Sequence, residues 1–139
     1  MWLMNGTTVL GSQILFTSPV WQVSLLGDLN GDGKADLIWR NSQTGQTAAW
    51  LMNGTAVSSS ATLLELTNWR ITQVGDLDGD SKDDLIWTNA TTGQTVVWLM
   101  NGLSSSNSTV LFTHPQWRVS RIADMDGDGK ADLIWTNAA

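Results

Sequence analysis

The stretch Asp28-Leu-Asn-Gly-Asp-Gly-Lys-Ala-Asp-Leu-Ile-Trp39 decides how the chain is organised, because versions of it begin again at Asp76 and at Asp124, each 48 residues further on. The repeat is longer than this stretch, since residues 27–54 and 75–102 are identical at 20 of 28 positions. All nine tryptophans share the same 48-residue spacing and form three sets: Trp2, Trp50 and Trp98; Trp21, Trp69 and Trp117; Trp39, Trp87 and Trp135. A period of this length indicates an array of similar structural units.

Each unit has the pattern of four short β-strands. Residues 21–26 alternate apolar and polar side chains, as a half-buried strand does. After the acidic stretch come two apolar runs, 36–39 and 47–52, and the second ends at Asn53-Gly54, a strong turn signal. We expect the serine-rich segment that follows to be a loop leading to a fourth strand near Leu63-Leu64. No segment shows helical periodicity.

Four strands in a repeat of this length predict an all-β fold, a β-propeller made of four-stranded blades with about three blades per chain. A solenoid of stacked sheets is the alternative, but its coils are usually shorter. We interpret residues 1–139 as a single repeat domain. Its parts are the second half of a blade at 1–26, repeat 1 at 27–74, repeat 2 at 75–122 and the first half of a blade at 123–139.

The negative charge is concentrated in the repeated stretches. The net charge is −6, yet twelve of the thirteen acidic residues are aspartates inside the three stretches, which carry −9 once their three lysines are counted. Carboxylates packed this closely repel one another and need a counter-charge. Outside them there is no basic stripe, so nucleic acid is not an expected partner. There is also no cysteine, no signal-peptide pattern and no apolar run long enough to cross a membrane.

Oxygen-bearing side chains stand at positions 1, 3, 5 and 9 of each acidic stretch. Calcium takes six to eight hard oxygen ligands, and a tight loop with alternate side chains turned inward can supply four of them. The backbone carbonyl at position 7 can supply a fifth. The sequence therefore predicts about three calcium ions per chain, with the ligands Asp28, Asn30, Asp32, Lys34 and Asp36; Asp76, Asp78, Asp80, Lys82 and Asp84; Asp124, Asp126, Asp128, Lys130 and Asp132.

Other metals fit less well. Zinc is disfavoured because the chain has no cysteine and a single histidine, His114. Magnesium is possible, although it prefers a stricter octahedron. The first half of the loop is similar to an EF-hand loop, but its twelfth position, where an EF-hand has glutamate, is Trp39 in the first stretch and a tryptophan in the other two.

The motif D-x-[DN]-G-D-[GS]-K-x-D followed by L-I-W, recurring in a tryptophan-rich repeat, resembles the FG-GAP/VCBS-type repeat. This resemblance covers the whole chain. It implies propellers such as those of integrin α-subunit heads and of sugar-binding fungal lectins, in which the matching loop positions hold calcium structurally. The FG and GAP motifs themselves are absent. The family also implies an extracellular or cell-surface location.

A carbohydrate-binding, lectin-like role is the first functional hypothesis. Tryptophan faces stack on sugar rings, and arginine bonds hydroxyl groups. The candidate ligand-binding residues are Trp21, Trp69, Arg70, Trp117 and Arg118. The competing interpretation is that every tryptophan packs between blades. The alternative function is a structural or protein–protein interaction propeller with no sugar site.

An enzyme is not expected, because His114 has no counterpart in the other repeats and the acids are committed to metal. The expected partner is a second copy of the chain. The end of the sequence aligns with the first half of a blade and its beginning with the second half, so that two chains would form a six-bladed ring. Three chains and nine blades are the second choice, since propellers usually have ~4–8 blades.

Overall fold

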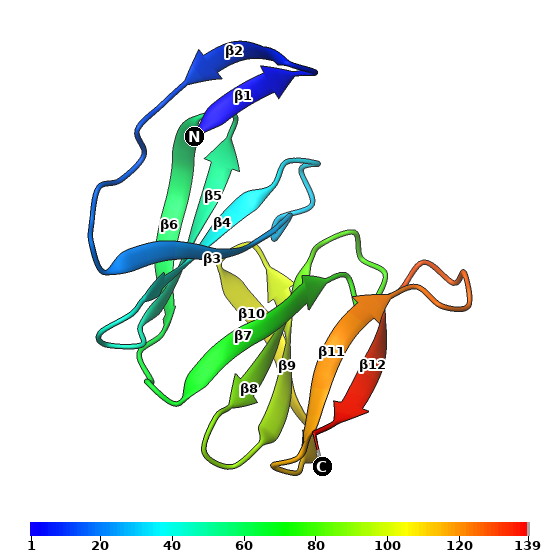
Figure 1. Ribbon diagram of the computed structural model, residues 1–139. Helices are drawn as coiled ribbons and strands as arrows, with labels where there is room; N and C mark the ends of the chain where they lie inside the picture. Colours follow the sequence, from blue (N-terminus) through cyan, green and yellow to red (C-terminus); the bar gives the residue numbers. More distant parts are fainter. Residues whose placement is uncertain (139) are drawn as a thin grey trace.

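Twelve β-strands and no helix make up residues 1–138, the part of the chain that the computed structural model describes (Figure 1). The expected all-β class is therefore confirmed. The strands are β1 (Trp2–Asn5), β2 (Thr8–Ser12), β3 (Trp21–Gly27), β4 (Asp36–Asn41), β5 (Thr47–Asn53), β6 (Ala56–Leu64), β7 (Trp69–Gly75), β8 (Asp84–Asn89), β9 (Gln94–Asn101), β10 (Ser104–Thr113), β11 (Trp117–Ala123) and β12 (Asp132–Asn137).

The strands form two complete antiparallel sheets and two hairpins. One sheet has the order β3-β4-β5-β6 and the next repeats it as β7-β8-β9-β10. The remaining strands pair as β11-β12 and β1-β2, one hairpin at each end of the chain. Four-stranded antiparallel meanders that succeed one another in this way are the blades of a β-propeller. Each sheet begins one strand before the corresponding sequence repeat, because β3 ends at Gly27, the residue at which repeat 1 begins.

The serine-rich segments are strands and not loops, contrary to the expectation from composition. β6 and β10 run almost the full length of their neighbours and form the exposed outer edges of the blades. Each contains a register shift, at Ser58 and at Ser106, and the serine hydroxyl there donates to the carbonyl of Leu51 or Leu99 across the pair. Polar residues and bulges suit an edge strand, because they blunt its tendency to pair further.

Leu15 and Phe16, which lie 48 residues before the expected fourth strand at Leu63-Leu64, are not in a strand, although Leu64 is. Leu64 pairs with Thr47 at the start of β5. β1 begins at Trp2, which corresponds to Trp50 in the middle of β5, so it has no residue to pair with Phe16.

The core lies between successive blades. One cluster joins the first and second blades around Leu29, Ile38, Leu85 and Trp87, with Trp69, Ile71 and Val74 packed against it. A second cluster joins the second and third blades around Ile86, Val97 and Val119. The third cluster, around Leu37, Trp39 and Met52, lies on the other face of the first blade. A blade thus buries its faces against its neighbours, and each strand is apolar on both faces where it is covered.

Candidate metal-binding loops and inter-blade pockets

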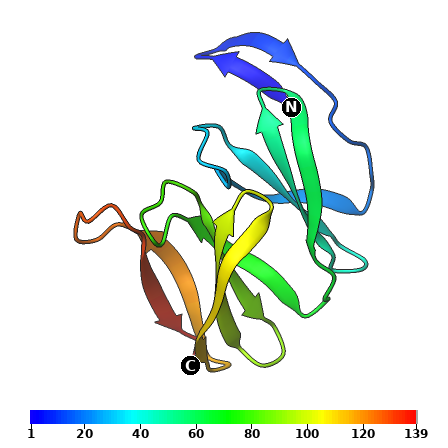
Figure 2. The ribbon, with the colours of Figure 1, turned by 180° about the vertical axis from the view of Figure 1, so that it is seen from behind.

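The three acidic stretches are the loops that connect the first strand of each blade to the second: β3 to β4, β7 to β8 and β11 to β12. Both ribbon views show them along one side of the molecule (Figures 1 and 2). Neighbouring loops are bonded directly. The Asp83 amide donates to the Asp28 carbonyl at 2.7 Å, and the Ala131 amide donates to the Asp76 carbonyl at 2.7 Å.

The first aspartate of each loop accepts several hydrogen bonds from backbone amides of the same loop. Asp28 accepts hydrogen bonds from the amides of Gly31 (2.8 Å), Asp32 (3.1 Å) and Gly33 (2.7 Å). Asp124 accepts the three equivalent bonds, and Asp76 accepts two of them, from the amides of Gly79 and Ser81. At Asp124 these amide donors, led by Gly129, lower the pKa of the carboxyl below its ordinary value. The loop backbone can bend around this carboxylate because position 4 is a glycine with positive φ in all three loops. Position 6 is also a glycine with positive φ in loops one and three.

The last aspartate of the first two loops is buried at the start of the second strand. Asp36 is fully buried, and its two oxygens accept from the amides of Met52 (2.8 Å) and Leu29 (2.9 Å). Asp84 is 1% exposed and accepts from Met100 and Leu77 in the same way. Burial raises the pKa of both carboxyls, and the other loop aspartates raise it further. A buried carboxylate that faces other carboxylates and no side-chain cation fits a bound metal ion.

The fifth-position aspartate contacts the lysine side chain two residues later. Lys34 Nζ lies 3.2 Å from Asp32, and Lys82 Nζ lies 2.7 Å from Asp80. These lysines lower the pKa of Asp32 and Asp80, and Asp80 raises the pKa of Lys82. Sequence reasoning assigned these lysines a role through their carbonyls and missed the ion pairs. The spacing of two residues between aspartate and lysine in a tight loop could have indicated these ion pairs.

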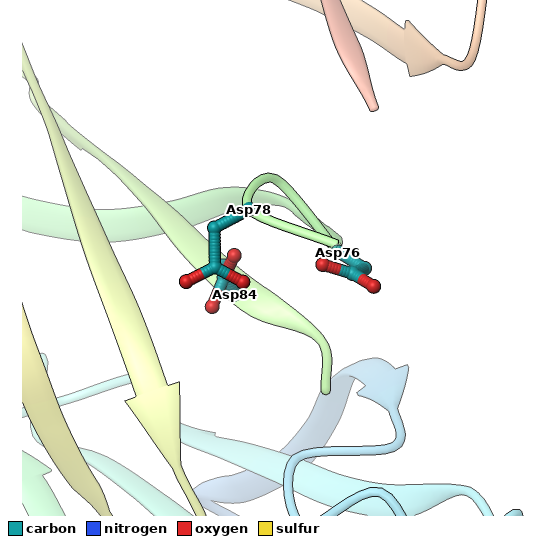
Figure 3. Close-up of side chains that lie close together, drawn as sticks. All are labelled: Asp76, Asp78 and Asp84. Carbon is teal, nitrogen blue, oxygen red and sulfur yellow. The ribbon is translucent and has the colours of Figure 1, made fainter. Parts of the chain in front are cut away.

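Carboxylate groups converge in two of the loops. In loop two, oxygens of Asp76, Asp78 and Asp84 lie within 4.8 Å of one another, and Figure 3 shows these three side chains close together. In loop three, oxygens of Asp124, Asp126 and Asp128 likewise lie within 4.8 Å of one another. Asn30 takes the third position of loop one, where its side-chain oxygen accepts from the Asp32 amide at 3.0 Å. The donor set is oxygen throughout, which suits a hard cation such as calcium.

A second repeated feature is an apolar pocket at each blade, walled by the tryptophans at the start of the first strand. Trp21, Trp69 and Trp117 are half-buried and line one pocket each. The pocket of the first blade is also lined by Phe16, Trp39, Ala48 and Trp50. The pocket of the second is lined by the corresponding Leu64, Trp87, Val96 and Trp98, together with Leu66 and Ser108. Leu111, Phe112, Leu133 and Trp135 complete the third.

Of the predicted ligand-binding residues, the structure brings the tryptophans to these pockets but not the arginines. Arg70 and Arg118 are exposed and do not line them. Successive strand residues point to opposite faces of a sheet, so an arginine beside a pocket tryptophan is turned away from it. Sequence reasoning missed Phe16, Leu64 and Phe112, which close the pockets. Their 48-residue spacing could have identified them as a repeated set.

Antiparallel four-stranded blades, each carrying one acidic loop between its first two strands, define a β-propeller-type repeat protein. The chain matches the model of the FG-GAP-like repeat twice, over residues 28–87 and 76–135, and it belongs to this family. No curated protein and no solved structure shows significant similarity to it. Within residues 1–138 there is no helix long and apolar enough to span a membrane.

Proposed function

We propose that the chain is a calcium-binding propeller module in which each acidic loop holds one ion. The observation that carries this proposal is the burial of Asp36 and Asp84, two carboxylates whose pKa is raised by burial and by the neighbouring loop aspartates. A bound cation would offset that charge. It would cross-link positions 1, 3, 5 and 9 of the loop to the start of the second strand, so its role is structural.

Titration calorimetry on protein stripped of metal tests this proposal. We expect about three calcium ions to bind per chain, with magnesium binding more weakly because the loops cannot enforce its octahedron. Asp84→Asn should lower the number of calcium ions bound per chain by one. Its matched control is Glu65→Gln, which lies outside the loops and should leave the number unchanged. No heat from calcium in the unmodified protein would contradict the proposal.

Carbohydrate binding at the inter-blade pockets is the second candidate function. The pockets are apolar and repeat once per blade, and tryptophans offer flat faces for stacking on a sugar ring. Two of the lining tryptophans, Trp39 and Trp87, have buried indole N–H groups with no hydrogen-bond partner among the described residues. Because these atoms have almost no accessible surface, a sugar in the pocket would contact the tryptophan rings and not these donors.

A glycan array followed by the Trp69→Phe variant tests this second candidate. We expect weaker sugar binding with the fold retained, because Trp69 is only half-buried. Arg70→Ala, next to it on the opposite face, is the matched control and should leave sugar binding unchanged. A silent array together with a protein partner captured from the source would favour the alternative, a structural or protein–protein interaction propeller.

A non-catalytic role and an extracellular or cell-surface location complete the proposal. Both are supported by the loops, whose carboxylates are engaged in holding the loop or in ion pairs. Modules outside cells commonly use calcium sites of modest affinity, since calcium is abundant there. The location would be tested by fractionating the source cells and probing each fraction with an antibody.

A further inference from the structure

Loop one is attached to loop two by two hydrogen bonds that both involve Asp83. The Asp83 amide donates to the Asp28 carbonyl at 2.7 Å, and the Asp28 amide donates to the Asp83 carboxylate, also at 2.7 Å. The next residue of loop one, the fully buried Leu29, accepts at its carbonyl from the Gly102 amide at 2.8 Å. The second blade therefore holds the backbone of loop one at its first two residues.

The two aspartates in this contact stand at important places in their own loops. The carboxylate of Asp28 accepts hydrogen bonds from three amides of loop one and occupies position 1 of the expected calcium ligands. Asp83 directly precedes Asp84, the buried carboxylate at position 9 of loop two. The contact thus links a candidate ligand of one loop to the neighbour of a candidate ligand of the next.

The surrounding backbone leaves space for the Asp83 side chain. A Cβ at Gly27 would lie 2.9 Å from Asp83 Oδ2 and 3.2 Å from Asp83 Cβ, so the glycine makes room for the carboxylate. The tips of the two loops also touch, because a Cβ at Gly31 would lie 3.3 Å from Lys82 Cγ. Loops one and two are therefore packed against each other, and the carboxylate lies within that packing.

The junction between loops two and three lacks the carboxylate. It has the backbone bond, from the Ala131 amide to the Asp76 carbonyl at 2.7 Å, and the contact at the tips, since a Cβ at Gly79 would lie 3.2 Å from Lys130 Cε. Position 8 is alanine there, and a methyl group cannot accept a hydrogen bond. The two junctions therefore differ in whether position 8 provides an acceptor.

We propose that Asp83 is a positioning residue for the calcium site of loop one and that it couples this site to the site of loop two. The inference rests on the proposed calcium binding. Asp83 acts by fixing the backbone of Asp28, through a hydrogen bond to a charged acceptor, which is roughly twice as strong as one between neutral groups. When binding in loop two fixes Asp84, the adjacent Asp83 is fixed as well. Coupling between two sites is reciprocal, so each site strengthens the other.

The sign of the coupling distinguishes this contact from electrostatics alone. Two bound divalent cations repel each other, so neighbouring loops without a positioning residue should bind calcium with negative coupling or with none. We expect positive coupling between loops one and two and a smaller or negative coupling between loops two and three. Equal coupling at the two junctions would overturn the proposal.

A calcium titration followed by amide NMR signals reports the loops separately. The Gly33 amide, which donates to Asp28, reports loop one, and the Ser81 amide, which donates to Asp76, reports loop two. We expect Asp83→Ala to weaken calcium binding in loop one by about tenfold. Asp83→Asn keeps an acceptor oxygen and loses the charge, so it should restore most of this affinity.

Two results of this titration would overturn the role of Asp83. One is an unchanged affinity of loop one in Asp83→Ala while calcium still binds. The other is an Asp83→Asn protein that behaves like Asp83→Ala, because the charge and not the hydrogen bond would then cause the effect.

A double-variant cycle tests the coupling itself. Asp84→Asn removes binding in loop two, and we expect loop one to bind calcium about fivefold more weakly as a result. In the Asp83→Ala background the same change should have little further effect. Equal losses in the two backgrounds would contradict coupling through Asp83.

The reverse variant, Ala131→Asn, keeps the proposal testable if Asp83→Ala does not fold. It gives the junction between loops two and three an acceptor at position 8 without adding charge. Gly75 precedes Asp76 as Gly27 precedes Asp28, so the same space is available. We expect tighter calcium binding in loop two and no change in loop one. No gain in loop two would count against the positioning role.

Hydrogen exchange of the Asp28 amide in EDTA separates this inference from calcium binding. We expect slow exchange in the unmodified protein and in Asp83→Asn, and exchange about tenfold faster in Asp83→Ala. Fast exchange in the unmodified protein would show that the bond is not formed and would overturn the proposal. If exchange is slow but calorimetry detects no calcium binding, the proposed function fails and the coupling fails with it. Calcium binding without any effect of Asp83 overturns the coupling alone.

Discussion

At the scale of single residues, Ser81 is the only residue among 1–138 with positive φ that is not glycine, at 67°. It stands where Gly33 and Gly129 stand in the other loops. A residue with a Cβ loses about 1–2 kcal/mol in this region. Ser81→Gly should therefore raise the free energy of unfolding by about 1 kcal/mol. Gly33→Ser is the matched reverse, because a Cβ at Gly33 meets nothing within 4 Å and only φ changes. Urea unfolding measures both, and a neutral Gly33→Ser would refute the argument.

The buried carboxylates predict an unusual dependence on pH. The pKa of Asp36 and Asp84 is raised above 3.8 by burial, so in EDTA they destabilise the fold increasingly as pH rises from 3.8 through their folded pKa. Asp32, Asp80 and Asp124 have lowered pKa values, so their contribution is lost as pH falls below 3.8. We expect the melting temperature in EDTA to rise as the pH is lowered through the folded pKa of these two carboxyls towards 3.8, and to fall below that pH.

With calcium bound the first trend should reverse. Protons compete with the metal for the carboxylates, so mild acidification should lower the melting temperature. Scanning calorimetry between neutral and acid pH, with and without calcium, distinguishes the two cases. Parallel curves would show that the loop carboxylates do not bind the metal.

At the scale of strands, the first two blades each approach the next blade so closely that their first strand ends in glycine, at Gly27 and Gly75. A Cβ at Gly27 would lie 2.4 Å from Val74 Cγ1, and one at Gly75 would lie 2.5 Å from Ile122 Cδ1. Gly27→Ala should cost about 1–3 kcal/mol, and Gly75→Ala less, because the end of isoleucine moves more freely than the branch of valine. Gly11→Ala, with nothing within 4 Å, is the control. Equal effects at Gly27 and Gly11 in urea unfolding would contradict this packing.

The strands also show how far the sequence predicts the structure. The sequence predicts four strands in a blade, and the fourth, near Leu63-Leu64, lies within β6. The serine-rich part of this outer strand was assigned to a loop because its serines are exposed at an edge, where only pairing with β5 or β9 makes them a strand. The acid positions of the loops were predictable from spacing alone. The lysine ion pairs and the packing of Phe16 depend on the geometry of the folded chain, so they could not be predicted from spacing.

At the scale of the whole molecule, the blades and their loops depend on one another. Each loop lies between the first two strands of a blade, and loops two and three are each bonded to the loop before them. Metal bound in a loop would therefore stabilise a blade and its junction together. Removing such a metal would leave closely spaced carboxylates uncompensated, and a ligand that binds only the folded state stabilises it by mass action.

Thermal unfolding of the purified protein with calcium and with EDTA is the most direct test of calcium binding by the loops. We expect a clearly higher melting temperature with calcium, one that rises with calcium concentration as linkage requires. We also expect the gain to shrink in Asp36→Asn and Asp84→Asn variants. An unchanged melting temperature, in a protein that also contains no metal by elemental analysis, would contradict the account.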